Sequence, residues 1–331
     1  MTMKDLIADF PQNITEALEI ASKASFANPA NEIRNIVVCG MGGSGIGGRL
    51  VAGWMQDELS VPVISAQDYY APNFVSQHTL VIASSYSGNT EETLASVLEA
   101  KEKGAHIIGV CSGGKIKDIC DENGYDVVVV PGGNPPRSAL AYSAIQLLNI
   151  FAQLGLTSVQ GLADIKAGQE LIVSSEAEVH QLGKEVAQFL HGNVGIIYGT
   201  TEYEPVLVRA RQQFNENSKS LCWHHAIPEM NHNELVGWGG GDSRFATLFI
   251  DTDMNARNRK RMEITRDVIS GKSSGQVHTL VAKGNSRIER SIYFINVLDW
   301  ASWYLSELNG ADAIEIEVID YLKGSLAAFE G

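Results

Sequence analysis

Two polar turns in the chain carry residue types that bind phosphate, and the first follows the apolar run Ile36–Cys39. It reads GMGGSG over residues 40–45, and a helical pattern comes next. Such a turn lets backbone N–H groups approach an anion closely, and the helix N-terminus adds unsatisfied donors and a positive dipole end. We therefore expect phosphate to bind at this turn, with the hydroxyl of Ser44 as a further donor.

The second polar turn follows the apolar run Thr79–Ser84 and reads SYSGNTEET over residues 85–93. In an open α/β sheet, ligands bind where strands end and helices begin, so we expect the two turns to form one cradle of hydroxyls and backbone amides. A helix cap is the plainer alternative, because Ser, Thr and Asn are good N-caps and acidic residues suit a first turn. One cap needs only one hydroxyl, and the surplus favours a ligand.

Other ligands compete for the first turn. Its glycines satisfy the dinucleotide pattern GxGxxG, but that pattern expects an acidic residue roughly 20 positions later, and Asp68 comes late for this role. A nucleoside triphosphate loop needs Gly-Lys-Ser/Thr, and there is no lysine between Asn35 and Arg49. A tight turn without any ligand is the third possibility, which four glycines within six residues make less attractive.

Strands alternating with helices position both turns. Apolar runs and helical patterns alternate from residue 36 to residue 130, which predicts an α/β fold with a doubly wound, mainly parallel sheet. The proline- and glycine-rich tract 131–136 breaks the pattern, a long helix follows over 138–154, and the alternation restarts at Asn193. We therefore expect a duplicated architecture with two domains, 1–154 and 155–331.

The charge and composition of the chain argue against some classes of binding partner. The chain of 331 residues has a net charge of −14, which argues against nucleic acid or an anionic membrane as a general partner. Its four cysteines lack CxxC spacing, its N-terminus does not resemble a signal peptide, and no apolar run approaches the ~18 residues of a membrane helix. A cytoplasmic location is expected.

The motifs together resemble a known family. GMGGSG paired with SYSGNTEET is similar to the sugar isomerase (SIS) fold, which implies a three-layer α-β-α arrangement in each domain. The motifs PPR, NENSK and PEMNHNELVGW resemble the bifunctional phosphoglucose/phosphomannose isomerase family, in the same order along almost the whole chain. The resemblance implies reversible conversion of glucose 6-phosphate, with mannose 6-phosphate as a further candidate, to fructose 6-phosphate. It implies no metal, no cofactor and a homodimer with a shared active site.

The resemblance also assigns residues. The catalytic base falls on Glu216, the ring-opening histidine on His232, the charge-stabilising arginine on Arg137 and a substrate lysine on Lys323. The phosphate site falls on Gly42, Gly43, Ser44, Ser85, Ser87 and Thr90. The chain has Asp-Ala-Ile-Glu at 312–315, where the family commonly has Asp-Pro-Thr-Pro, and the lost hydroxyl weakens the expectation of mannose activity.

These residue types suit aldose–ketose isomerisation. A carboxylate can take a proton from C2 and return it at C1, an arginine in a rigid Pro-Pro-Arg turn can stabilise the enediolate, and histidine can open the sugar ring near pH 7. Each also has a plainer role: Glu216 and Lys323 as solvated charges, and Arg137 as a loop cap or the partner of a surface acid. A phosphosugar-binding regulator without turnover is the competing function, because fold does not determine function.

His232 has two alternatives of its own. With His224, His225, Glu229 and Glu234 it could bind a metal, but the spacing matches no HExxH or Cys/His site. Asn231 and Asn233 could instead fix its tautomer. The segment from Trp223 past Pro228 breaks the strand–helix rhythm, which is typical of an excursion that reaches a neighbouring chain.

Overall fold

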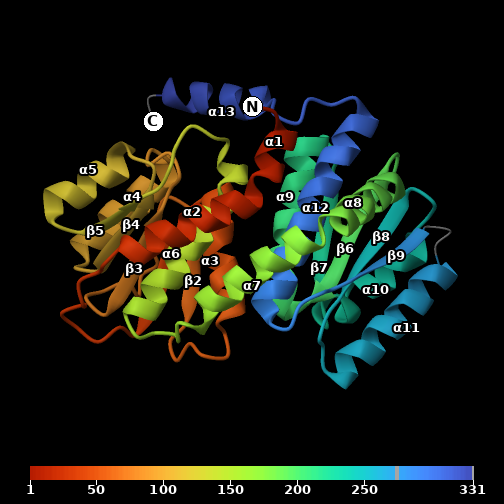
Figure 1. Cartoon of the computed structure of the whole chain (residues 1–331), viewed down its shortest axis with the longest axis horizontal. Coiled ribbons are helices and arrows are strands. Elements are labelled where there is room, and N and C mark those ends of the chain that lie inside the picture. The colour runs from red at the N-terminus through yellow and green to blue at the C-terminus, as the bar shows by residue number, and fades with distance from the viewer. Residues whose placement is uncertain (273–275, 330–331) are drawn as a thin grey trace.

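The computed structural model describes residues 1–272 and 276–329 and confirms an α/β fold with two parallel sheets (Figure 1). The first sheet has the strand order β2-β1-β3-β4-β5, and every pair in it is parallel. Its strands are β1 Asn35–Cys39, β2 Val63–Ala66, β3 Thr79–Ser84, β4 His106–Cys111 and β5 Asp126–Val129.

Alternate residues of these strands enter two different cores. In β1, Ile36 and Val38 belong to a core with helices on one face, whereas Val37 and Cys39 belong to a core on the other. A parallel sheet covered on both faces needs such continuous apolar runs. The outer face is covered by α4 Glu91–Glu102 and α5 Gly114–Asn123, and the inner face by α2 Phe10–Lys23, α3 Gly42–Trp54 and α6 Leu140–Gln153.

The second sheet repeats this design, as the sequence predicts. Its order β7-β6-β8-β9 matches the order of the first four strands of the first sheet. The strands are β6 Val194–Thr200, β7 Cys222–Ile227, β8 Phe245–Asp251 and β9 Gln276–Val281. Its outer face is covered by α10 Glu234–Gly237 and α11 Ala256–Lys272, and its inner face by α8 Glu176–Leu190, α9 Glu204–Ser218 and α12 Arg287–Asn309.

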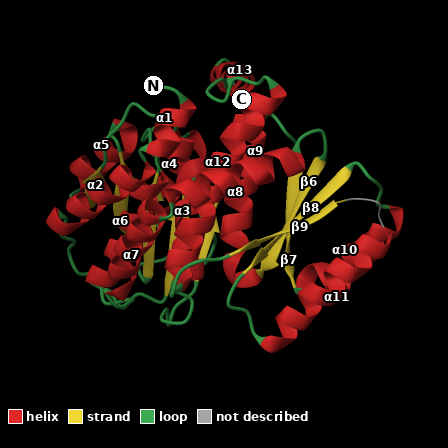
Figure 2. Cartoon of the chain, turned by 45° about the vertical axis from the view of Figure 1, so that its right-hand side comes forward, coloured by secondary structure: helices red, strands yellow, loops and turns green. Residues whose placement is uncertain are grey.

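The inner helices of both halves form one layer between the sheets, which Figure 2 shows from the side. A single apolar core runs through this layer and contacts both sheets, and α7 Gln160–Ser174 contributes to it. Trp300 of α12 is buried here. The shared core holds the carboxyl ends of the strands in the two sheets at fixed positions relative to each other.

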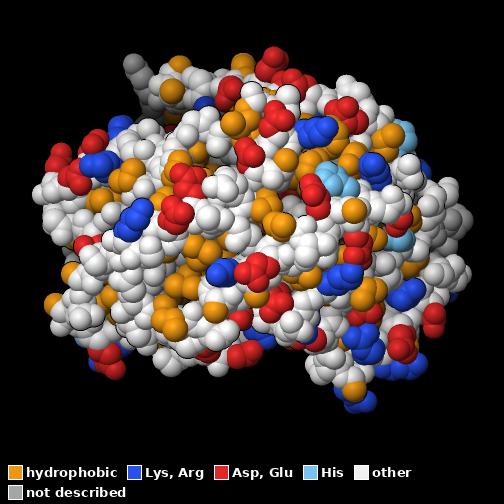
Figure 3. Space-filling view, viewed as in Figure 1, with side chains coloured by type: hydrophobic (Ala, Val, Ile, Leu, Met, Phe, Trp, Pro, Cys, Tyr) orange, Lys and Arg blue, Asp and Glu red, His pale blue; other side chains and the backbone are white. Residues whose placement is uncertain are grey.

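The last helix, α13 Glu317–Ala327, is different, because none of its residues is buried. Val318 is 80% exposed and Tyr321 78% exposed, and the helix lies along the upper edge of the molecule in Figure 1. On the face shown in Figure 3, acidic and basic side chains are mixed over most of the surface, and several basic side chains lie close together at the lower right. Within the described residues, no helix is long and apolar enough to cross a membrane.

One local expectation needs correction. The chain begins with the short helix α1 Met3–Ala8, and α2 follows at Phe10, where Pro11 suits a first helical turn. The helix after the first glycine turn, α3, starts at Gly42, within the glycines. Residues Cys222–Ile227, expected to be part of an excursion, form the regular strand β7, so only the segment from Pro228 to Gly241 leaves the pattern.

Candidate active site

The two polar turns meet at the point where the strand order of the first sheet reverses. The turn 40–45 follows β1 and the turn 85–93 follows β3, and these strands are adjacent and parallel. In an order such as β2-β1-β3-β4-β5, the crevice beyond the carboxyl ends of β1 and β3 is the usual ligand position. The topology therefore brings the expected phosphate residues of both turns together.

Hydrogen bonds connect the two turns directly. The backbone N–H of Tyr86 donates to Oγ of Ser44 at 2.9 Å, and the hydroxyl of Ser84 donates to the carbonyl of Ser44 at 3.2 Å. The hydroxyls of Ser85 and Thr90 lie 2.9 Å apart. The first turn is thus held against the second.

Ser87 is the exception among the expected phosphate residues. It is exposed, and its hydroxyl accepts a hydrogen bond from the backbone N–H of Asn89 at 3.2 Å, within its own turn.

The helix-cap alternative does not describe these hydroxyls. Thr90 is the N-cap of α4, yet its side chain makes no capping hydrogen bond and instead meets Ser85. At the start of α3 the N-cap is Met41, which likewise provides no side-chain cap. Both helices therefore present first-turn N–H groups that no side chain caps, as an anion site requires.

Gly43 joins the first turn to the Pro-Pro-Arg turn. A Cβ atom at Gly43 would lie 2.7 Å from the carbonyl oxygen of Pro136 and 3.1 Å from the backbone nitrogen of Arg137. Only glycine allows this approach, because real Cβ atoms do not come so close to backbone atoms. The glycine turn consequently places Arg137 beside the expected phosphate cradle.

The guanidinium of Arg137 is only 4% exposed and is surrounded by acceptors. Nε donates to Oδ1 of Asn217 at 2.8 Å, and Nη1 lies 3.3 Å from Oε2 of Glu216. Nη2 donates to the carbonyls of Ala313 at 2.6 Å and Ile314 at 3.3 Å. Burial lowers the pKa of Arg137 below its ordinary value, and the charges of Glu216 and Asp312 oppose that shift.

Glu216 lies in the last turn of α9. Its side chain is 28% exposed, and it lines a pocket of about 450 Å³ together with residues of the 315–319 segment. The carboxylate therefore combines a buried cationic partner on one side with an open space on the other. This arrangement suits a base that must reach a small substrate.

Sequence reasoning did not find the support behind Arg137. Arg209 of α9 donates to the carbonyl of Arg137 at 3.2 Å and to Oδ2 of Asp299 at 2.6 Å, and both members of this ion pair are buried. Arg209 stands seven residues before Glu216, so the two lie on the same face of the helix. The spacing within α9 was a signal that could have identified Arg209.

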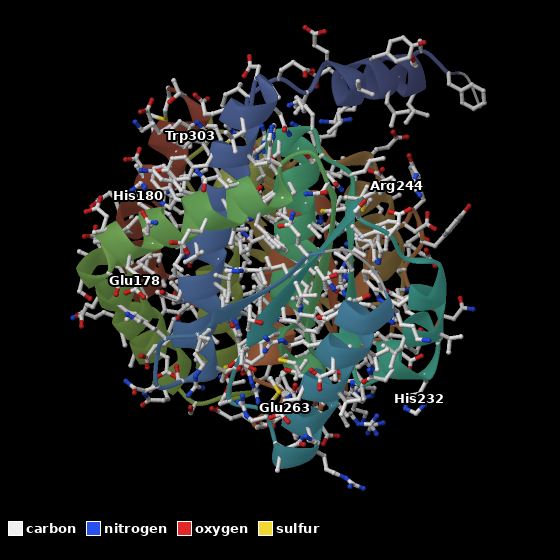
Figure 4. All side chains as sticks on the ribbon, turned by 90° about the vertical axis from the view of Figure 1, so that its right-hand side faces the viewer. Glu178, His180, His232, Arg244, Glu263 and Trp303 are labelled. Carbon is white, nitrogen blue, oxygen red and sulfur yellow. The ribbon has the colours of Figure 1, made fainter. Side chains whose placement is uncertain are left out.

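The structure does not bring the other two assigned residues to this place. His232 ends the short 3-10 helix η3 Glu229–His232 and is exposed. In Figure 4 it lies at the lower edge of the molecule, whereas α13, whose first residues line the Glu216 pocket, lies along the top. Lys323 is exposed on α13. Within one chain, the site contains Glu216, Arg137 and the phosphate turns.

The residues around His232 have partners of their own. Nδ1 of His225 lies 2.6 Å from Oε2 of Glu234, and in the described part of the chain no three His, Cys, Asp or Glu side chains form a metal-binding group. In the described part of the chain, the side-chain amides of the two asparagines that flank His232 donate to other residues. Asn231 donates to Thr265 and Asn233 donates to Glu229.

Two family models match the chain. The SIS domain model matches residues 31–125, and the model for the bacterial phospho-glucose isomerase C-terminal SIS domain matches residues 179–326. The solved C-terminal domain of glucosamine-fructose-6-phosphate aminotransferase from Francisella tularensis has the same fold, with a TM-score of 0.73, 16% identity and coverage of 95% of this chain and 98% of that one. Fold and site thus define a protein built from two SIS domains.

Full-length relatives specify the family. The bifunctional phosphoglucose/phosphomannose isomerase of Caldicellulosiruptor bescii is 39% identical over 98% of this chain and 99% of its own length. That of Aquifex aeolicus is 33% identical over 88% of this chain and 90% of its own. The chain belongs to the bifunctional phosphoglucose/phosphomannose isomerase family, and it is an enzyme of the sugar-phosphate isomerase class.

Proposed function

We propose that this enzyme interconverts glucose 6-phosphate and fructose 6-phosphate by proton transfer through an enediolate. The observation that carries the proposal is the contact between Arg137 and Glu216, 3.3 Å apart, directly beside the turn that holds Gly43. A base, a cation and an anion cradle are what the reaction needs in one place. The names of the relatives support the substrate class.

In the proposed reaction, the N–H groups and hydroxyls of the two turns bind the 6-phosphate, with Gly42, Gly43, Ser44, Ser85, Ser87 and Thr90 as the contacts. Glu216 removes the proton from C2 of the open-chain aldose and returns it to C1. The enediolate between these steps is negatively charged and gains from fixed positive charge. Glu216 then ends in its starting state, so one carboxylate completes the transfer between the carbons, and the hydroxyl proton passes from O2 to O1 in the same cycle.

Arg137 supplies the positive charge. A guanidinium has five N–H donors, and four hydrogen bonds to protein acceptors leave one N–H of Nη1 for the substrate. Because the group is already held by the protein, it does not have to reorganise when the enediolate forms. This is the property expected of a preorganised electrostatic stabiliser.

We further propose a homodimer in which His232 of a second copy opens the sugar ring. His232 is exposed and distant from Glu216 in its own chain, and it lies on the surface of the irregular segment 228–241, where a neighbouring chain can reach it. Lys323 is proposed as a substrate contact that α13 brings to the site. We place the domain boundary between residues 154 and 155.

We also propose a cytoplasmic location, with no nucleic acid or membrane partner, no cofactor and no metal. The acidic balance of −14 and four free thiols among the described residues support this environment. Glucose is the preferred epimer in this proposal. The turn 312–315 has Ile314 where the family commonly has a threonine hydroxyl, and the side chain of Ile314 has no polar atom.

The test is a product assay on the purified protein. Fructose 6-phosphate is supplied, and glucose 6-phosphate and mannose 6-phosphate are measured separately, with and without a chelator. We expect glucose 6-phosphate to form faster than mannose 6-phosphate, and the chelator to leave both rates unchanged. Tight binding of fructose 6-phosphate with no product above background would favour the non-catalytic regulator instead.

A further inference from the structure

The residue after α9 has a backbone conformation that glycine usually adopts. Lys219 has φ 52° and ψ 35°, and within residues 1–272 and 276–329 it is the only non-glycine residue with a positive φ. The helices α5 and α12 end in the same left-handed conformation with Gly124 and Gly310. A side chain makes this backbone conformation unfavourable, so we expect contacts of the Lys219 side chain to offset the cost.

The ammonium group of Lys219 makes three such contacts. It donates to the carbonyls of Glu216, Asp312 and Glu315, each at 2.7 Å. An ammonium has three N–H donors, so all of them are used. The first acceptor belongs to the helix end that carries the proposed base, and the other two belong to the turn that leads into α13.

Arg137 holds the two remaining carbonyls of that turn. Its Nη2 donates to the carbonyls of Ala313 and Ile314, between the two that Lys219 holds. Four successive carbonyls, 312–315, therefore accept hydrogen bonds from two cationic side chains, and Glu216 lies between these cations in the same assembly. Moving the turn would disturb Arg137, and releasing the end of α9 would move Glu216 away from Arg137.

We infer that Lys219 is a positioning residue for the reaction: it ties the end of α9 to the 312–315 turn and so holds Glu216 against Arg137. This inference rests on the proposed function, in which Glu216 is the base. Because Lys219 acts on geometry and the phosphate cradle lies elsewhere, its loss should affect the chemical step more than substrate binding.

The experiment compares Lys219→Met, Lys219→Gly and Lys219→Arg with the wild type and with Lys260→Met. Lys260 is an exposed lysine of α11 whose only described ion pair is with Glu263 at 3.0 Å, so it controls for the loss of one positive charge. We expect Lys219→Met to lower kcat by about 10- to 100-fold with KM within about threefold of the wild type. Lys219→Arg should recover part of kcat.

Lys219→Gly separates positioning from stability. Glycine relieves the left-handed backbone but has no ammonium, so the variant should keep a Tm near that of the wild type while its kcat falls as far as that of Lys219→Met. A kcat near the wild-type value in a folded Lys219→Gly protein would overturn the inference. The same holds if KM alone rises in Lys219→Met.

Hydrogen exchange provides a readout that does not depend on turnover. Lys219→Met should speed amide exchange in residues 312–320 and at the end of α9, whereas Lys260→Met should not. Unchanged exchange would also overturn the inference. If wild-type protein has no isomerase activity, or Glu216→Gln keeps it, the proposed function fails on its own, and the exchange result still decides whether Lys219 holds the turn.

Discussion

Nη1 of Arg137 lies 3.3 Å from Oε2 of Glu216, across 79 residues of sequence. The arginine is almost fully buried, while the carboxylate is open to a pocket on its other side. A buried cation that keeps its charge must be compensated by hydrogen bonds and a counter-charge, and Glu216 provides the counter-charge. The pair therefore links the half of the molecule that carries the two polar turns to the half that carries the proposed base.

Glu216→Gln should abolish isomerisation while sugar 6-phosphates still bind. The amide keeps the shape and can still accept a hydrogen bond from Arg137, but it cannot take the proton from C2, so the loss falls on the transition state. Turnover and binding are measured separately, by product assay and calorimetry. A rate above about a tenth of wild type would exclude Glu216 as the base, since general base catalysis contributes ~100-fold or more.

Ser44→Ala and Thr90→Val should each raise KM by about tenfold and leave kcat nearly unchanged. Each removes a hydroxyl next to a phosphate that does not react, and a hydrogen bond to a charged group contributes about 1.5–3 kcal/mol. Ser84→Ala is the comparison variant, because its hydroxyl lies at the end of β3, donates to the Ser44 carbonyl at 3.2 Å and is not one of the proposed phosphate contacts. Equal KM values in all three variants would show that the cradle lies elsewhere.

Subunit mixing tests the shared site. Inactive Glu216→Gln and inactive His232→Ala chains are mixed, unfolded and reassembled, so that half the dimers contain one chain of each kind. Each mixed dimer then has one site with both defects and one intact site, which predicts roughly a quarter of wild-type activity by two-fold symmetry. If mass spectrometry detects mixed dimers but no activity is recovered, His232 acts within its own subunit.

His224 predicts a pH dependence of stability. Burial lowers its pKa from 6.5 to about 4, with Arg211, Arg49 and His225 acting in the same direction and Glu234 against them. The unfolded chain then binds this proton more tightly than the folded chain, so the stabilisation is fully present above about pH 6.5 and is lost as the pH falls toward 4. The full effect is on the order of 3 kcal/mol.

Urea unfolding at several pH values measures this effect. His224→Gln should flatten the fall in stability between pH 6.5 and 4 relative to wild type. His106 and His180, whose pKa values burial also lowers, contribute with the same sign and remain in both proteins. An identical slope in the two proteins would mean that His224 does not titrate in this window.

The sequence by itself determined the class of fold and the position of the two polar turns, because both depend on local patterns. The apolar runs Thr79–Ser84 and His106–Cys111 begin and end at the same residues as the strands β3 and β4. This agreement arises because buried parallel strands must be apolar on both faces. Glycine and hydroxyl residues after β1 and β3 are likewise visible from neighbouring positions. The motif NENSK marked Glu216 through its resemblance to the family.

Only the tertiary structure decided which distant groups meet. The contacts of Arg137 with Asn217 and Ala313, and of Lys219 with Asp312, join residues 80, 176 and 93 positions apart, and no periodicity predicts such pairs. Their geometry depends on how the central helices pack between the two sheets. The same packing leaves His232 on the surface and α13 without buried residues. The residues that the sequence assigned to one site therefore lie partly in the packed interior and partly on exposed segments.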